Sequence, residues 1–263
     1  MRAYWSVFSA RFRTLLQYRA AAMAGVATQL FWGLIRMMIF AAFYASSDAP
    51  QPMTYPEVVT YVWLGQGMLL LVMFGADPEV VQMIRSGTVA YELARPLDLY
   101  RLWYCRALAA RTAPTLLRMA PVFLIAGLFF GLQAPASFTC AGLWLLATAA
   151  AVLLGAALAT VLTISLFWTI AGEGITRLVS GSIFILSGMI VPLPLFPDWL
   201  QPVLTFLPFR GMADTPFRIY LGHIPPTDAV WAVAHQLAWA AGLVLVGRVL
   251  LARGLRRLVV QGG

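Results

Sequence analysis

The chain has 263 residues, of which 61% are apolar and 11% charged, and its mean hydropathy is +0.82. Soluble domains are nearer half apolar and a quarter charged, so the excess apolar surface must be buried in lipid. The net charge is +8, and all 18 cations are arginine. Without lysine the chain has no Walker A phosphate loop, so any ATP that drives it is hydrolysed by another chain.

Charges divide the chain into apolar stretches long enough for membrane-spanning helices, which need about 20 residues each. The third and fourth stretches are separated by Gly131 to Ser137, a segment with the composition of a turn. The sequence therefore predicts an all-α polytopic membrane protein with six transmembrane helices in a single domain, 1–263. The expected spans are 20–44, 58–76, 112–131, 138–168, 175–196 and 228–250.

The arginine distribution predicts the orientation of these spans. If both termini are inside, fifteen arginines lie in inner segments, and the outer connections hold only Arg210 and Arg218 against five acids. Positive residues are enriched in inner loops, so the chain is expected to be a multi-pass protein with both termini inside, N-in and C-in. The excess of arginine is thus explained by the membrane, and no nucleic acid partner is expected.

The first residues, 1–19, have an amphipathic pattern. Tyr4, Phe8 and Phe12 share one helical face, and Arg13 lies on the other. This pattern predicts a helix lying on the membrane surface before the first span, and the alternative is a frayed basic leader.

The inner connection, 77–111, is long for a membrane hairpin. Asp77, Pro78 and Glu79 have the pattern of a helix start, and Ser86-Gly87 that of a helix end. The following residues are more apolar than a solvated loop requires, which favours docking of a partner protein over a plain loop. The candidate docking residues are Glu79, Ile84, Arg85, Gly87, Glu92, Leu93, Arg95 and Pro96.

The outer connection, 197–222 with the residues before it, contains five prolines between Pro192 and Pro208. It is too proline-rich for one helix and too apolar for water. We expect a re-entrant helical hairpin that forms an outer gate, with Asp198 as a helix cap and Trp199 as a packing contact; the alternative is a cap outside the membrane. The candidate gate residues are Pro192, Phe196, Trp199, Phe206, Pro208 and Phe209.

Arg36 is an ionisable residue within the first span. It is expected either to line a pathway or to extend its cation to the outer headgroups. The two histidines and two cysteines have no spacing typical of a metal site, and no cofactor is expected on this chain.

The two unusual connections resemble those of a known family. The residues that carry the resemblance are Ile84 to Thr88 and Leu93 to Leu97 inside, and Leu186 to Leu193, Phe196-Pro197, Leu207 to Phe209, Pro216 and Leu221-Gly222 outside. They resemble the permease subunit of type-2 ATP-binding-cassette exporters, in a bacterial subfamily usually paired with a second permease and a separate ATPase.

The resemblance implies specific partners and roles. Residues 79–97 would hold a coupling helix that docks in the ATPase subunit, and 188–221 would hold paired re-entrant helices at the outer end. Two permease subunits, different or identical, would face each other through their first, second and fifth spans. Two ATPase copies would bind ATP and Mg²⁺, so this chain would not be an enzyme by itself, and its substrate is not implied.

Two other classes were weighed on the residues. An intramembrane protease of the rhomboid type needs a Gly-x-Ser-Gly signature, but Ser187-Gly188 follows Ile185-Leu186. An ion-driven membrane transporter usually has acids at mid-membrane, and all ten acids are expected outside the span centres. Both alternatives are therefore less favoured than an exporter subunit.

Overall fold

The fold is known from a computed structural model that describes residues 2–47, 49–72, 75–169 and 173–256. These residues form helices and connections, and no strand occurs among them. The α-helices are α1 (Arg2–Leu16), α2 (Arg19–Ser46), α3 (Tyr55–Gly67), α4 (Leu69–Val72), α5 (Pro78–Ser86), α6 (Val89–Leu93), α7 (Leu99–Phe129), α8 (Phe138–Ser165), α9 (Glu173–Leu186), α10 (Gln201–Phe206), α11 (Asp214–Tyr220) and α12 (Pro226–Leu255). Three short 3-10 helices are η1 (Leu193–Leu195), η2 (Asp198–Leu200) and η3 (Pro208–Met212).

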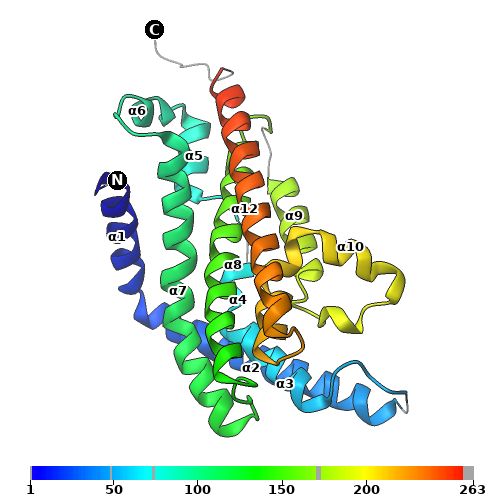
Figure 1. The fold of residues 1–263 in the computed structure, drawn as a ribbon. Coiled ribbons are helices and arrows are strands. Elements are labelled where there is room, and N and C mark those ends of the chain that lie inside the picture. The colour runs from blue at the N-terminus through cyan, green and yellow to red at the C-terminus, as the bar shows by residue number, and fades with distance from the viewer. Residues whose placement is uncertain (1, 48, 73–74, 170–172, 257–263) are drawn as a thin grey trace.

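The centre of the molecule is a bundle of α7, α8 and α12, with α11 and η3 packed against α8 (Figure 1). Helix α8 buries a row of small residues, including Ala147, Ala150, Gly155 and Ala156. Small side chains let helix backbones approach closely, which is how helices associate where no water drives them together. Helices α2 and α3 pack on α7 and cross the bundle obliquely (Figure 1).

Four helices in the described part of the chain are long and apolar enough to cross a membrane: α2, α7, α8 and α12. They coincide with the first, third, fourth and sixth expected spans. The second corresponds to α3 and α4, which are interrupted at Met68, and the fifth to the shorter α9. The chain is thus a helical, multi-pass membrane protein by its helix lengths and composition.

Two helix boundaries differ from the expected ones. The third span and the segment before it form one helix, α7. Asp98 caps its start by accepting the backbone N–H of Arg101 at 2.8 Å. The fifth expected span, 175–196, ends early: α9 stops at Leu186, and Gly188 has a left-handed φ of +84° that turns the chain.

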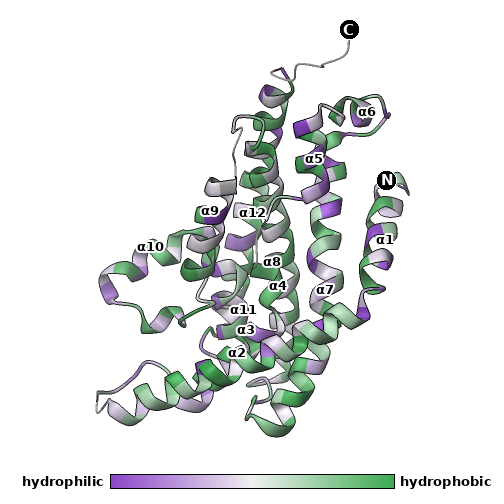
Figure 2. Ribbon diagram, turned by 180° about the vertical axis from the view of Figure 1, so that it is seen from behind, coloured by the Kyte–Doolittle hydropathy of each residue, from purple (hydrophilic) through white to green (hydrophobic). Residues whose placement is uncertain are grey.

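The connections gather at two ends of the bundle. Helices α5 and α6, the start of α1 and the end of α12 lie at one end, where polar residues concentrate (Figure 2). At the other end Tyr220 donates to the carbonyl of Gln133 at 2.8 Å, and the Gln133 backbone donates to Thr60 at 3.1 Å. Below, the end with α5 and α6 is called the inner end, following the arginine distribution.

Helix α1 does not lie across the bundle as a helix in the membrane plane would. It runs alongside α7 (Figure 1), and Tyr4 accepts the backbone N–H of Asp98 at 2.8 Å. The rings of Trp5, Phe8 and Phe12 stack on one another with centroids 5.5 and 5.6 Å apart. The amphipathic pattern identified the helix but not its partner, which is protein rather than only the membrane surface.

Candidate functional site

The inner segment begins with a doubly capped helix. Asp77 accepts the backbone N–H groups of Glu79 and Val80 at 3.0 and 3.4 Å, which starts α5. Gly87 ends it in the left-handed conformation, with φ of +73°. Val80 is fully buried between the caps, so α5 is fixed at both ends and along one side.

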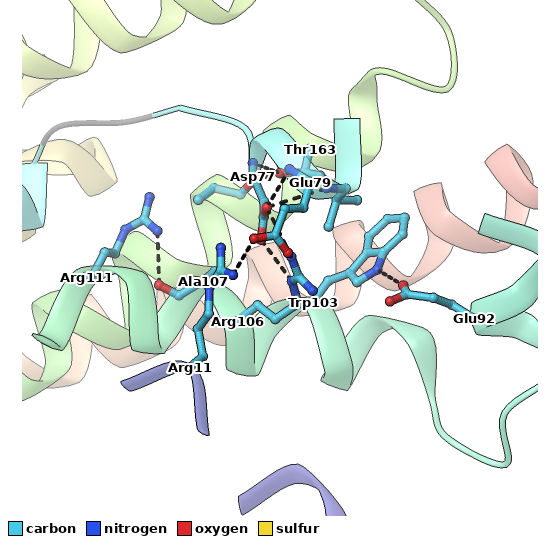
Figure 3. A network of polar contacts seen from close by, with 11 residues as sticks. Arg11, Asp77, Glu79, Glu92, Trp103, Arg106, Ala107, Arg111 and Thr163 are labelled. Carbon is cyan, nitrogen blue, oxygen red and sulfur yellow. Dashed lines mark hydrogen bonds and ion pairs between the residues drawn. The ribbon is translucent and has the colours of Figure 1, made fainter. Parts of the chain in front are cut away.

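A polar network joins α5 to two other helices (Figure 3). Arg106 of α7 donates to Asp77 at 2.9 Å and to Glu79 at 2.5 Å, and Arg11 of α1 also donates to Glu79. The hydrogen bond from Arg11 is the largest influence on Glu79, and together with Arg106 it outweighs burial and lowers the pKa of this carboxyl. The three helices are therefore linked through Glu79.

Glu92 faces inward. Its carboxylate accepts the indole N–H of Trp103 at 2.9 Å (Figure 3), and the residue is only 8% exposed. The sequence predicted Glu92 as a charge contact for a partner, but in this structure it holds α6 to α7. Nothing in the spacing indicated this, because the partner is eleven residues away on another helix.

The outward side of the segment is formed by Tyr91, Leu93, Arg95 and Pro96, which we call the docking face. Tyr91 is 76% exposed and Leu93 46%, and Arg95 and Pro96 are exposed as well. Large apolar side chains with this exposure at a polar end of a molecule are typical of contact surfaces.

The other candidate docking residues lie on α5. Ile84 is half-buried and packs against the cluster that contains Val80, Arg85 is exposed, and Gly87 is half-buried. Glu79 is exposed but already bound to two arginines. These residues border the docking face rather than forming it.

The outer segment folds as η1, η2, α10, η3 and α11. Pro192 and Pro208 are buried, Phe196 and Phe209 are half-buried, and Gln201 donates to the carbonyls of Leu193 and Phe196 at 2.7 and 3.0 Å. The segment is thus a compact structure tied together by its own polar groups.

Two expectations for this segment are wrong. Trp199, expected as a packing contact, is 76% exposed and is not buried by this chain. Phe206 is 69% exposed but makes an edge contact with Trp239. Asp198 is the first residue of η2 and makes no capping hydrogen bond; the N-cap is Pro197. Apolar side chains placed next to lipid or a second subunit have the same composition as core residues, so the sequence did not separate them.

The end of α10 lies deep beside α12. The Phe206 carbonyl accepts the indole N–H of Trp239 at 3.0 Å, and His235 Nε2 lies 3.0 Å from the same oxygen. His235 and Trp239 are nine and thirteen residues after Pro226, where α12 starts. At 1.5 Å per residue they lie about 14 and 20 Å along the helix. Gln236 donates to Gly211 at 2.5 Å on the same part of α12.

The turn after α9 is held by three helices. The backbone N–H of Asp214 donates to the carbonyl of Ser187 at 3.0 Å, and the Asp214 carboxylate accepts from Tyr61 at 3.1 Å. Arg36 donates to the carbonyl of Met189 at 2.7 Å. Asp214 is 1% exposed and also lies 3.7 Å from Arg218. In the sequence, nothing except Arg218 four residues later distinguishes Asp214 from the other acids of the outer connections.

Arg36 lies at the junction of two cavities. One, of about 470 Å³, is lined by α2, α3, α4 and α9, and the other, of about 500 Å³, continues along α2 to Leu195. Ser180 is shared between the first cavity and an inner one of about 600 Å³ that contains Arg85 and Arg177. Two of the three cavities are lined by α9, and the 500 Å³ cavity continues along α2 past the end of α9.

The chain was compared with known proteins. No curated protein matches it. A family model described as "ABC-2 family transporter protein" matches residues 30–262, which include all of the inner and outer segments described above. The chain therefore belongs to the ABC-2 family of transporter proteins.

Proposed function

We propose that the chain is the permease subunit of an ATP-driven exporter in the bacterial cytoplasmic membrane. It forms half of the translocation pathway and is not an enzyme by itself. Members of the ABC-2 permease family generally work with an ATPase subunit, and the chain's lack of lysine excludes a Walker A loop of its own.

The single observation that carries this proposal is the docking face. Exposed Tyr91 and Leu93 lie at the polar inner end, on a segment that is fixed by the Arg106–Glu79 and Trp103–Glu92 contacts. A contact surface transmits movement only if the element behind it is rigid, and these bonds make it so. We assign the docking face to an ATPase subunit, with one copy for each of two permeases.

The pathway is assigned to the three cavities, which are joined through Arg36 of α2 and Ser180 of α9. Large side chains of α2 lie at these cavities or next to them and are more than half exposed, among them Phe31, Trp32 and Ile39. A second permease, different or identical, would cover these side chains. Such a pairing would enclose the cavities between two subunits.

The outer segment is proposed to be re-entrant and to gate the pathway. Its support is the position of Phe206, about 14 to 20 Å along α12 from that helix's outer start, in a bilayer whose hydrocarbon core is about 30 Å thick. Exposed Trp199 and Phe206 would then contact lipid or the second permease.

The docking assignment is tested by co-expressing the chain with the ATPase subunit that co-purifies with the wild-type protein. Leu93→Asp and Tyr91→Asp should abolish co-purification while membrane insertion stays normal. Phe138→Asp is the matched control, because Phe138 is 99% exposed at the opposite end. Full retention of the ATPase by both docking-face variants would refute the assignment.

One observation favours the alternative of an ion-driven transporter: the buried carboxylate of Asp214. However, Tyr61 and Arg218 already satisfy it, as expected for a structural acid. Transport by reconstituted protein with a proton gradient and no ATPase, abolished by Asp214→Asn, would support the alternative. For an intramembrane protease, Ser187 and His235 have separate partners, the carbonyls of Phe184 and Phe206.

A further inference from the structure

We propose that the 470 Å³ cavity beside Arg36 binds an anionic amphiphile: a molecule with one negatively charged group, one neutral polar group and an apolar body. This inference rests on the proposed function only in treating the ligand as cargo. The binding site itself is argued from the cavity and its side chains.

Arg36 supplies the charge recognition. Its guanidinium donates once, to the Met189 carbonyl at 2.7 Å, and lies 5.8 Å from the centre of the Phe184 ring. A guanidinium has five N–H donors, and no carboxylate in the described residues pairs with this one. An arginine without an acid in an apolar span is costly, and an anion in the cavity would remove that cost.

Two glutamines supply the neutral polar recognition. Gln29 and Gln66 are 2% and 1% exposed and line the same cavity. Both amide atoms of Gln29 and the carbonyl oxygen of Gln66 have no hydrogen-bond partner among the described residues. Buried polar groups are normally paired, and a bound molecule toward which these amides turn would supply the missing partners.

The spacing of these groups sets the shape of the ligand. Gln29 and Arg36 are seven residues apart on α2, which is two turns or about 10 Å along the helix. The cavity walls between them include Trp32, Leu69 and Phe184, which are apolar. The ligand therefore places its anionic group at Arg36, its neutral polar group at Gln29 and Gln66, and its apolar body between them.

The cavity is also of suitable size. Sites for small ligands occupy about 300 to 1,000 Å³ and are mostly apolar with a few polar groups. A volume of about 470 Å³ holds one acyl chain or a fused ring system with its headgroup. Either a free amphiphile or the headgroup and one chain of an anionic lipid meets these requirements.

The test uses the full-length protein in phosphatidylcholine nanodiscs and a dansyl-labelled undecanoate. This probe carries a carboxylate, an apolar chain and a sulfonamide, and its methyl ester lacks the charge. Arg36→Gln should weaken binding of the carboxylate by at least about tenfold but leave binding of the ester unchanged. Arg36→Lys should retain part of the affinity.

Two further variants test the site independently of Arg36, so the proposal can still be tested if the Arg36 variants misfold. Gln29→Leu and Gln66→Leu should each weaken binding of both probes several-fold, because each removes a neutral polar contact. Arg13→Gln, on the exposed side of α1, removes one positive charge elsewhere and should have no effect. Equal affinities for carboxylate and ester, or a loss in Arg13→Gln as large as in Arg36→Gln, would overturn the proposal.

Nanodiscs with added phosphatidylglycerol distinguish the source of the ligand. Displacement of the probe by this lipid identifies the occupant as an anionic phospholipid, and lack of displacement identifies a free amphiphile. Both outcomes support the site. Because the assay needs no ATPase, failure of binding with intact ATPase co-purification would remove this inference alone.

Discussion

Trp103 of α7 donates its indole N–H to the buried carboxylate of Glu92 at 2.9 Å, and this bond holds α6 in place. We predict that Trp103→Phe, which keeps the stack on Phe167 but removes the donor, costs about 1.5 to 3 kcal/mol of local stability. Hydrogen exchange should then increase in residues 88–95. Tyr104→Phe is the control, because Tyr104 is also on α7 and its hydroxyl donates to a different helix, at the carbonyl of Leu153.

The attachment of α1 should depend on pH through Glu79. The pKa of Glu79 is lowered below its ordinary value of 4.5, chiefly by the hydrogen bond from Arg11. Because the pKa of Glu79 is lowered in the folded state, ionised Glu79 stabilises the fold fully above pH 4.5. This stabilisation is lost as the pH falls through the folded-state pKa of Glu79. A spin-label distance between α1 and α5 should therefore increase under acid conditions, and Glu79→Gln should show the increase at neutral pH. A distance unchanged by either treatment would contradict this.

Gly188 should not tolerate a side chain. Its φ is +84°, and a Cβ there would approach Leu193 to 3.1 Å and Asp214 to 3.3 Å. Gly188→Ala should cost at least about 1 kcal/mol from the backbone alone and lower the melting temperature. Gly142→Ala, where a Cβ meets nothing within 4 Å, should leave it unchanged or slightly higher. Equal melting temperatures would show that this turn is not constrained.

The outer segment should separate from α12 when its contacts are removed. Trp239→Phe and His235→Ala remove the partners of the Phe206 carbonyl. If this segment closes the pathway, the double variant should raise basal ATPase activity or leak without reducing ATPase binding. Trp231→Phe is the control, because Trp231 is on the same helix but 76% exposed. Wild-type leak and basal activity in the double variant would argue against a gate.

The orientation can be measured by cysteine labelling after Cys105 and Cys140 are replaced. Cysteines at Ser46 and Ala134 should react from outside, and those at Ser86 and Arg253 only after permeabilisation. All four sites are exposed in the structure. The reverse pattern of labelling would invalidate the arginine argument.

The parts of the fold that follow local rules could be predicted from the sequence. Asp77, Gly87 and Ser137 mark helix ends because caps act over three or four residues. The lengths of α2, α8 and α12 follow from long stretches that are mostly apolar. Pairings across helices were not predictable in this way. The Tyr61–Asp214 bond joins residues 153 positions apart, and neither residue type indicates the other.

The candidate residues show the same limit. Hydropathy indicated that the inner and outer segments contact something, but it did not distinguish inward from outward positions. Glu92 turned inward although it is charged, and Trp199 turned outward although it is aromatic. In a membrane protein the exposed side can be as apolar as the core, so burial must be taken from the three-dimensional structure.

The continuity of α7 has a consequence for how force travels through the molecule. One helix of 31 residues, about 47 Å long, joins the cap at Asp98 to the outer turn after Phe129. Pro114 and Pro121 lie inside it and cannot donate to the carbonyls of Ala110 and Leu117. The helix therefore lacks two backbone hydrogen bonds, and we expect it to bend at these two levels when its inner end is displaced.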